Sequence, residues 1–372
     1  MKSRGAILRD VPGKFEVVDL VVDEPRRNEI RVKMVAAGLC HSDVHMATGD
    51  TPVLTFPFCG GHEGGGVVES VGPDTEGFEP GEKVIFNFLP VCGRCQWCST
   101  GHQNLCDLGA GAMIGARWED PTSFRMALPD GTPVGQALGV STFAEYTTVS
   151  TMSAVKVPDD TPLEKACLVG CAVGTGWGSA VNTGGVHPGD TVVIFGIGGI
   201  GSMAVQGAVH AGASRVIVVD PVELKRETAL ALGAAFAVAT ADEAIAIAKA
   251  GTNGQGADVA IVTVGFTEGE HVAQAVAAIR KRGTVVVTGM GAITDIGVPV
   301  SLFELTTMEK TIRGSLFGSS NPLADIPKLV ELYRRGQLKL DELITAEYAL
   351  DDIAQGFEDM LGGKNVRGVV RF

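Results

Sequence analysis

The sequence predicts an α/β protein of two domains, one rich in β-strands and one built on a parallel β-sheet. The chain has 372 residues, and at roughly 100–200 residues per domain this length suggests about two domains. Up to about residue 150, short apolar runs alternate with turns, whereas from about residue 173 strand-like runs alternate with helical segments. Such alternation is typical of βαβ units and a parallel sheet. The change of pattern places a domain boundary near residue 172.

The first 150 residues are predicted to be β-rich. Their apolar runs are separated by Gly, Pro and Asp turns, and the uneven spacing is typical of a distorted barrel and not of a repeat. The expected strands are Ile30–Val35, Gly66–Val71 and Lys83–Phe88.

The second half alternates between buried strands and helices. The expected strands are Thr191–Phe195, Arg215–Asp220, Ala257–Val264 and Thr284–Gly289. The expected helices are Ser202–Ala211, Glu223–Leu232 and His271–Lys281. After about residue 317 the pattern loosens, and the remaining expected elements are two helices and a closing strand, at Pro327–Arg335, Leu350–Leu361 and Val366–Arg371.

Composition and charge narrow the class of protein. Apolar residues make up 45% and charged residues 20% of the chain, which is globular composition and excludes wholesale disorder. The net charge of −13 disfavours binding to a phosphate backbone. The first 20 residues lack the pattern of a secretory signal, and the uncharged run Thr191–Ser214 has glycines that fit strand, turn and helix better than a membrane span. We expect a cytoplasmic protein that binds neither nucleic acid nor membrane.

Four cysteines crowd into one loop, as Cys92-x2-Cys95-x2-Cys98-x7-Cys106. Four thiolates so close together can surround one tetrahedral zinc ion. Because the four sulfurs leave no coordination position open for a substrate, that zinc is expected to be structural. Buried small apolar side chains are the plain alternative. An iron–sulfur cluster is the stronger one, because C-x2-C-x2-C also opens ferredoxin motifs. Those motifs continue with a cysteine three residues later and then proline, whereas here seven residues intervene and Asp107 follows.

A glycine-rich turn follows the expected strand Thr191–Phe195 and opens a helix. Asp220 lies 19 residues beyond the last of these glycines, at the end of the next strand. This context is the dinucleotide-binding fingerprint, with the pyrophosphate at the helix N-terminus and the acidic side chain on the adenosine ribose. A carboxylate there repels a 2′-phosphate. The next residue is Pro221 and not an arginine that could bind that phosphate, so NAD is favoured over NADP. The alternative is a purely structural turn. The glycines are Gly196, Gly198, Gly199 and Gly201.

A third group of residues is scattered along the chain. Cys40, His62 and Cys171 together make a zinc site with three ligands and one open position, which is the catalytic arrangement. From spacing alone, a lone His62 or Cys171 is just as well explained as a packed core residue. We interpret Cys59 and Cys167 as core thiols.

These motifs carry a family resemblance over almost the whole chain. The chain resembles zinc-dependent medium-chain alcohol dehydrogenases, and within that family it resembles the NDMA-dependent branch, whose members are nicotinoproteins that hold their cofactor through turnover. The family motifs are GLCHSDVH at 38–45, GHEGGG at 61–66, the four-cysteine loop, CLVGC at 167–171 and GIGGIG with Asp220. The branch is indicated by STGHQNLCDLGA, AVNTGG, VVDPVELKRETAL and GSLFGSSNP.

The resemblance implies a fold and an activity. A GroES-like catalytic domain over 1–172 is completed by 318–372, and a Rossmann domain over 173–317 is inserted, with the active site in the cleft. An alcohol is oxidised to an aldehyde or ketone by hydride transfer to NAD, with two zinc ions per chain and a redox acceptor if NAD stays bound. The resemblance also implies a homodimer or homotetramer, in which an added strand within the apolar segment Val298–Leu305 pairs across a two-fold axis.

The resemblance assigns roles around the catalytic zinc. Cys40, His62 and Cys171 bind the metal, and Glu63 approaches it when ligands exchange. Asp43 orients His62 from behind. Two further residues handle the proton of the alcohol: Ser42 takes it, and His45 passes it to solvent through the cofactor ribose.

The remaining roles concern the cofactor and the substrate. Lys225 joins Asp220 at the adenosine ribose, Arg367 reaches the pyrophosphate and Thr175 lies near the nicotinamide. His41 stands where many relatives have an arginine against the pyrophosphate, so the charge there depends on pH. Phe88 lines the substrate channel. For Lys225 and Arg367 the alternative is a solvated surface charge.

Three other functions fit parts of the sequence. A thiol-dependent formaldehyde dehydrogenase shares the fold and both zinc ions but needs an anion pocket for the carrier thiol, and no clear basic cluster stands out. A zinc-binding interaction module leaves the glycine turn and the scattered ligands unexplained. A quinone reductase of the same superfamily lacks both zinc ions.

Overall fold

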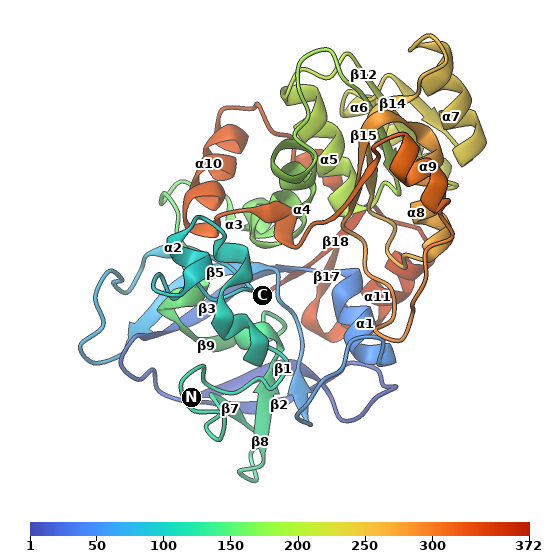
Figure 1. Ribbon diagram of the computed structural model, residues 1–372. Coiled ribbons are helices and arrows are strands. Elements are labelled where there is room, and N and C mark those ends of the chain that lie inside the picture. Colours follow the sequence, from blue (N-terminus) through green and yellow to red (C-terminus); the bar gives the residue numbers. More distant parts are fainter. The chain divides into compact units, whose positions relative to one another are not determined.

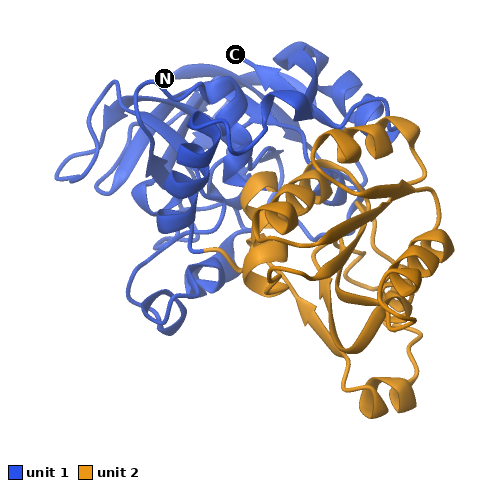
Figure 2. Ribbon diagram, turned by 90° about the horizontal axis from the view of Figure 1, so that it is seen from above, with its two compact units in different colours: residues 1–171, 321–372 blue, residues 172–320 orange.

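The computed structural model describes all of residues 1–372 and divides into two compact units (Figure 2). Unit 1 comprises Met1–Cys171 and Asn321–Phe372, and unit 2 comprises Ala172–Ser320. The boundaries expected from the sequence, 172/173 and 317/318, lie close to these.

Unit 1 contains a closed barrel and a second sheet (Figure 1). The barrel strands are β1 (Lys2–Leu8), β2 (Glu16–Val22), β7 (Met126–Ala127), β8 (Pro133–Gln136) and β4 (Phe58–Cys59). The second sheet has, in spatial order, β10 (Ala154–Lys156), β6 (Lys83–Phe86), β5 (Gly64–Val71), β3 (Glu29–Gly38), β18 (Arg367–Arg371) and β17 (Ile344–Ala349), and β9 (Tyr146–Ser150) also pairs with β3. Because β18 pairs with β3, the C-terminal segment completes the first domain.

The helices of unit 1 are short except near the C-terminus. They are α1 (His41–Thr48), α2 (Gln96–Ser99), α3 (Leu163–Ala166), α10 (Pro322–Arg334) and α11 (Ile353–Leu361). Helix α10 begins before its expected start at Pro327, because Pro322 occupies the first turn, where its missing N–H costs no hydrogen bond.

Unit 2 is built on one parallel six-stranded sheet. Its spatial order is β13 (Phe236–Val238), β12 (Arg215–Val219), β11 (Thr191–Phe195), β14 (Ala257–Val262), β15 (Ile279–Val287) and β16 (Thr311–Gly314). The strand order reverses at β11, so this is a doubly wound sheet, and ligands of such sheets bind beyond the carboxyl ends of the strands. The expected α/β fold class is confirmed.

The helices of unit 2 cover this sheet. They are α4 (Ala172–Gly178), α5 (Gly199–His210), α6 (Glu223–Ala231), α7 (Ala241–Ala250), α8 (Gly269–Ala278) and α9 (Leu302–Thr307). Ala244 and Ala248 of α7 share one buried core with Ala275 of α8 and with the sheet, since small side chains let the helices approach closely. The uncharged run Thr191–Ser214 folds as β11 and α5, and no helix is long and apolar enough to cross a membrane.

Two segments differ in their bounds from the expectation. The helix expected over 271–281 ends at Ala278, because Ile279 is extended and buried in the sheet as the first residue of β15. Within Val298–Leu305, the side chain of Ser301 accepts a hydrogen bond from the backbone N–H of Glu304 at 3.1 Å and caps α9. An added strand that pairs across a two-fold axis is therefore confined to residues 298–301 and stays a prediction.

Candidate functional site

The structure brings together the three scattered ligands within unit 1. Cys40 follows β3 as the N-cap of α1, His62 follows β4, and Cys171 ends the N-terminal segment. Their ligand atoms all lie within 4.8 Å of one another, and all three side chains are buried. Two sulfurs and one imidazole nitrogen at this spacing suit one tetrahedral zinc ion with a fourth position left for substrate.

Asp43 fixes the orientation of His62. Its Oδ1 atom accepts hydrogen bonds from His62 Nδ1 and from the backbone N–H of Gly61, both at 3.2 Å. Gly61 has φ +85°, a conformation that glycine adopts without strain. With Nδ1 engaged by a carboxylate, Nε2 is the ring atom that can bind a metal, which is the arrangement common to metal-binding histidines. Asp43 therefore has the orienting position expected from the sequence.

The protonation of Cys40 and His62 makes metal uptake depend on pH. The Cys171 thiol, as hydrogen-bond donor, and then His62 hold the pKa of Cys40 well below its usual value of 9.0. Burial alone lowers the pKa of His62, but the Asp43 carboxylate and the Cys40 sulfur raise it to about 10. A metal ion must displace the proton of the imidazole, so binding releases protons and weakens as the pH falls.

Helix α1 carries the two residues expected to handle protons. The Ser42 hydroxyl lies 3.7 Å from Cys40 Sγ, next to the ligand group. His45, one turn further on and only 2% exposed, lies with Nδ1 3.3 Å from Oδ2 of Asp50. The sequence analysis did not predict Asp50 as the partner of His45. Its place directly after Gly49, the residue that caps the end of α1, is a sequence signal that could have indicated it.

Glu63 and Arg367 form a buried ion pair beside the ligands, between Oε2 and Nη2. Arg367 is 5% exposed, so the alternative of a solvated surface charge is wrong for it. A Cβ on Gly38 would lie 2.0 Å from Glu63 Oε2 and 2.8 Å from Arg367 Nη2, so the pair requires glycine there. The sequence predicted no contact between these two residues, and the contact of Arg367 with a pyrophosphate stays a prediction.

Three further predicted residues have defined places. The Phe88 ring meets the His62 ring edge to face, with 5.5 Å between centroids, so it lies against a metal ligand as a channel residue must. His41 is the first residue of α1 and is partly exposed. Thr175 is buried in α4 of unit 2.

The four-cysteine loop also has the geometry of a zinc site. The sulfurs of Cys92, Cys95, Cys98 and Cys106 all lie within 4.8 Å of one another. Cys92 Sγ and Cys98 Sγ are 3.9 Å apart, close to the roughly 3.8 Å expected for two sulfurs 2.3 Å from one tetrahedral zinc. Since Cys92 and Cys95 are partly exposed, the alternative of four core thiols is wrong.

Backbone amides support the sulfurs of Cys92 and Cys95 as thiolates. The N–H of Cys95 donates to Cys92 Sγ and the N–H of Cys98 to Cys95 Sγ, each at 3.4 Å. The bond from Cys98 is the main reason that the pKa of Cys95 falls to about 6. Burial raises the pKa of Cys98 in this loop to about 12, as it does for Cys59 and Cys167, which we interpret as core thiols.

The glycine-rich turn of unit 2 connects β11 to α5. Gly196 has φ +87°, and a Cβ on Gly201 would lie 1.9 Å from the carbonyl oxygen of Gly196. A Cβ on Gly198 would meet no atom within 4 Å, so space lies open in front of the helix N-terminus. Gly199 is the first residue of α5. This loop therefore fits a pyrophosphate approaching the backbone closely.

Asp220 directly follows β12 and links the glycine-rich turn to the segment before α6. Its Oδ2 atom accepts from the N–H of Ile197 at 2.7 Å and its Oδ1 atom from the N–H of Val222 at 2.9 Å. Arg226, which the sequence analysis missed, donates from Nη1 to the carbonyl oxygens of Asp220 and Pro221 at 2.9 and 2.8 Å. A positive charge thus lies beside the Asp220 turn.

Lys225 is partly exposed on α6, close to Asp220 in the chain, and its contact with the ribose stays a prediction.

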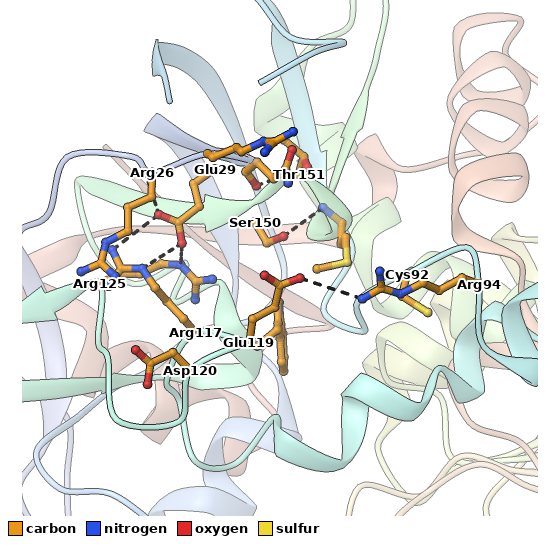
Figure 3. Close-up of a pocket in the computed structure, with 14 residues that line it drawn as sticks. Arg26, Glu29, Cys92, Arg94, Arg117, Glu119, Asp120, Arg125, Ser150 and Thr151 are labelled. Atoms are coloured by element: carbon orange, nitrogen blue, oxygen red, sulfur yellow. Dashed lines mark hydrogen bonds and ion pairs between the residues drawn. The ribbon is translucent and has the colours of Figure 1, made fainter. Parts of the chain in front are cut away.

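A separate cavity of about 340 Å³ in unit 1 is lined by five arginines (Figure 3). Glu29 lies among them and is buried; its Oε1 atom accepts from Nε of Arg125 at 2.7 Å and from Nε of Arg117 at 3.0 Å. Arg117 also pairs with Asp23 at 3.2 Å. The two buried arginines, Arg117 and Arg125, are thus already neutralised by carboxylates of this chain. The five are Arg26, Arg27, Arg94, Arg117 and Arg125.

Replacing Glu29 by glutamine is expected to lower the stability of unit 1. The change leaves the buried Arg125 without a carboxylate and Arg117 with Asp23 alone, which costs about 3–5 kcal/mol. Burial by itself raises the pKa of Glu29, but Arg125 and Arg117 outweigh it and hold that pKa below 4.5. The Glu29 carboxylate therefore stabilises the folded state fully above pH 4.5, and this stabilisation is lost as the pH falls through the lower pKa that Glu29 has in the folded state. Calorimetry should find a Tm gap between E29Q and the unmutated protein at pH 7 that narrows below pH 4.5.

Glu119 supplies the matched control for this prediction. It lines the same cavity, but its side chain is 77% exposed and lies 4.0 Å from Arg94. E119Q should change the Tm little, because exposed pairs contribute only about 0–1 kcal/mol. Equal Tm values for E29Q and E119Q at pH 7 would show that Glu29 does not hold the arginines.

Comparison with known proteins identifies the family. The family model described as alcohol dehydrogenase GroES-like domain matches residues 26–159, and the model described as zinc-binding dehydrogenase matches residues 199–335. The chain is 48% identical over 370 residues to the NDMA-dependent alcohol dehydrogenase of Amycolatopsis methanolica, across 100% of this chain and 99% of that protein. It is 50% identical over 370 residues to putative alcohol dehydrogenase D of Mycobacterium tuberculosis (strain ATCC 25618 / H37Rv), across the whole of both.

Solved structures agree with these sequence comparisons. The crystal structure of benzyl alcohol dehydrogenase from Acinetobacter calcoaceticus matches with a TM-score of 0.92 at 30% identity, across 100% of this chain and 99% of that one. An alcohol dehydrogenase zinc-binding domain protein from Burkholderia ambifaria matches with a TM-score of 0.93 at 31% identity and the same coverage. With full-length relatives at nearly half identity and a ligand set that suits zinc, the chain belongs to the family of zinc-dependent medium-chain alcohol dehydrogenases.

Proposed function

We propose that this chain oxidises alcohols to aldehydes or ketones with NAD as hydride acceptor, that it holds two zinc ions, and that NAD stays bound through turnover. The observation that carries the proposal is the convergence of Cys40, His62 and Cys171 in front of Asp43. A ligand set with an open fourth position suits a catalytic zinc, and the four-cysteine loop suits a structural one.

Each residue near the predicted catalytic zinc site has a role. Cys40, His62 and Cys171 hold the metal, and Asp43 keeps the His62 ring turned toward it. A zinc ion held there acts as a Lewis acid that makes the alcohol oxygen more acidic, and NAD supplies the carbon that accepts the hydride.

The chain's own residues manage the proton and the substrate. Ser42 accepts the alcohol proton beside Cys40. His45 is backed by Asp50, whose side chain is 22% exposed, so this pair offers the proton a way toward water. The ring of Phe88 beside His62 presents an apolar wall to the substrate.

The test of this activity compares alcohol oxidation by the purified chain before and after removal of zinc with a chelator, with nucleotide released by acid identified in parallel. Activity that survives complete loss of zinc would exclude the proposal. A requirement for an added thiol would instead favour formaldehyde oxidation.

Cofactor choice is expected to depend on Asp220. The change Asp220→Ser removes an acceptor for the ribose hydroxyls and a charge that repels a 2′-phosphate, while Arg226 remains beside the turn. The ratio of affinities for NADP and NAD should rise about tenfold or more, the size of a lost hydrogen bond to a charged group. Titration of cofactor-free protein measures the ratio.

Two further variants separate the effect of the Asp220 charge from its effect on the structure of the glycine-rich loop. Asp220→Asn keeps an acceptor for the N–H of Ile197 but removes the charge, so it should also raise the ratio. Glu223→Gln, an exposed acid at the start of α6, should leave the ratio unchanged. Tighter binding of NADP than of NAD by the unmutated protein would contradict the choice of NAD.

Retention of NAD is proposed from the resemblance to the NDMA-dependent branch, which the 48% identity to the NDMA-dependent alcohol dehydrogenase of Amycolatopsis methanolica supports. Retention requires a very slow off-rate, since affinity differences between related complexes lie mostly there. Reduced cofactor that cannot leave must be reoxidised in place by an acceptor or an aldehyde, which gives ping-pong kinetics. After gel filtration, an alcohol should be turned over with an artificial acceptor and without added NAD. Turnover with added NAD alone would mean that the cofactor exchanges.

A homodimer or homotetramer is also proposed. The apolar side chains of Val298, Leu302 and Phe303 are 42%, 75% and 77% exposed, which is a large apolar patch for a surface in contact with water. Light scattering at micromolar concentration should give at least twice the chain mass of 38.6 kDa. A monomer mass would refute the assembly without affecting the proposed chemistry.

A further inference from the structure

A network of hydroxyl groups joins two segments of unit 2 that are far apart in the sequence. Ser179–Thr183 forms one π-helical turn that continues α4, and it faces the segment that follows β16. Thr183 Oγ1 lies 2.8 Å from the hydroxyl oxygens of both Ser315 and Ser319, and Ser179 Oγ lies 3.1 Å from that of Ser315. Thr183 falls in the AVNTGG stretch and Ser315 and Ser319 fall in the GSLFGSSNP stretch, to which the function has so far given no role, and Ser179 directly precedes the first stretch.

The network extends at both ends. Ser179 Oγ lies 2.8 Å from Thr288 Oγ1 and donates to the carbonyl oxygen of Thr175 at 2.7 Å. Asn182 Nδ2 donates to the carbonyl oxygen of Gly318 at 3.1 Å. Ser179 and Thr183 are buried, and a hydroxyl group can donate once and accept twice. Buried groups that satisfy one another in this way make a rigid connection.

This network holds a strained turn. Phe317, Gly318 and Ser319 have φ values of 51°, 63° and 51°, three left-handed residues in succession, of which only glycine adopts that conformation freely. A Cβ on Gly318 would lie 2.4 Å from the carbonyl oxygen of Gly174, so the turn packs its backbone directly on α4. Strained backbone persists only where its surroundings fix it, and such sites are commonly ligand clamps.

The turn 317–319 lies at the edge of the sheet where one half of a bound dinucleotide is expected. Thr288 and Ser315 are the first residues after β15 and β16, at the carboxyl ends of the sheet, where ligands of doubly wound folds bind. Asp220 marks the adenosine half at the end of β12, on one side of the central strand β11. Strands β14, β15 and β16 lie on the other side, which leaves their ends for the nicotinamide half.

We infer that Ser179, Thr183 and Ser315 are positioning residues, which fix the turn 317–319 so that it holds the nicotinamide half of the cofactor and slows its release. The inference rests on the proposed use of NAD. It assigns the slow off-rate to the hydroxyl network, of which Thr183 contacts the turn directly, and not to the adenosine site.

The experiment uses the protein with its nucleotide reduced in place, so that release is followed by fluorescence during a chase with excess ADP-ribose. ADP-ribose has the adenosine and pyrophosphate of NAD but no nicotinamide, and its own affinity is measured in parallel. Thr183→Val removes the hydroxyl and keeps the shape of the side chain. Release should become about tenfold faster, as for the loss of one or two hydrogen bonds, while ADP-ribose affinity stays unchanged. Thr183→Ser should restore slow release.

Thr252→Val is the matched control within unit 2. The Thr252 hydroxyl donates to the carbonyl oxygen of Ala248 at 2.7 Å and accepts from the N–H of Gly256 at 2.8 Å, in the loop after α7. Its removal should lower the Tm without faster release. Unchanged release in Thr183→Val, or equal weakening of ADP-ribose, would overturn the inference. An unmutated protein that binds ADP-ribose but no nicotinamide nucleotide would overturn it together with the proposed cofactor, and that failure is visible before any variant is made.

Discussion

The variant C171S is expected to fold normally, to retain one zinc ion per chain and to lose alcohol oxidation by about a thousandfold or more. Cys171 is one of only three side chains in its ligand group, and its thiol also supports the low pKa of Cys40. A serine hydroxyl stays protonated at neutral pH and binds zinc poorly. The catalytic ion is therefore lost, and with it the Lewis acid on which the proposed chemistry depends. Metal analysis, far-ultraviolet circular dichroism and an alcohol assay check the three parts.

Cys167 provides a control within the same short segment. It is fully buried, its pKa is raised to about 12 by burial, and its thiol lies 3.9 Å from the carbonyl oxygen of Glu164. C167S should keep both zinc ions and most of the activity, with at most a moderate loss of stability. Two zinc ions and full activity in C171S would contradict the ligand assignment. Loss of both ions in C171S would mean that the two sites are coupled through the fold.

The regular elements of unit 2 could be predicted because their signals are local. Thr191–Phe195 is a β-branched apolar run between Asp190 and the glycine turn, and it forms β11 with those bounds. The boundary at Ala278 was missed because 271–281 is apolar with helical spacing throughout, and only burial of Ile279 in the sheet decides where the helix ends. Within Val298–Leu305, the apolar character did not indicate the helix that begins at Leu302, which depends on a local cap at Ser301.

The candidate site was predictable only where its residues carry a motif. The four cysteines and the glycine turn are contiguous, so spacing alone placed them. Cys40, His62 and Cys171 come from three segments, and their convergence depended on the family resemblance and then on the fold. Glu63 precedes β5 and Arg367 begins β18, and the two meet because both strands pair with β3, which no local pattern encodes.

Hydroxyl groups are the least predictable part of the site. Serine and threonine are common in loops and turns, so Thr183 and Ser315 carry no signal of their own. They meet only because α4 and the end of β16 pack together, and their partners lie more than a hundred residues away in the chain.

The variant C95S is expected to lose the structural zinc ion and much of the stability of unit 1. Metal binding to a structural site contributes directly to folding. The loop 92–106 has little other support: α2 is a single four-residue turn, and the buried cluster around it consists largely of the cysteines themselves. Losing about 4–5 kcal/mol would lower the Tm by roughly 10–20 °C. Calorimetry with metal analysis measures both.

Ser99 provides the matched control for the C95S variant. It lies in the same loop, is exposed, and donates from its hydroxyl to the carbonyl oxygen of Cys95 at 2.9 Å without a place among the sulfurs. S99A should keep both zinc ions and a Tm close to that of the unmutated protein, because only one exposed hydrogen bond is lost. A Tm of C95S as high as that of S99A, with one zinc ion gone, would show that the loop folds without its metal. Retention of two zinc ions by C95S would show that Cys95 is not a ligand.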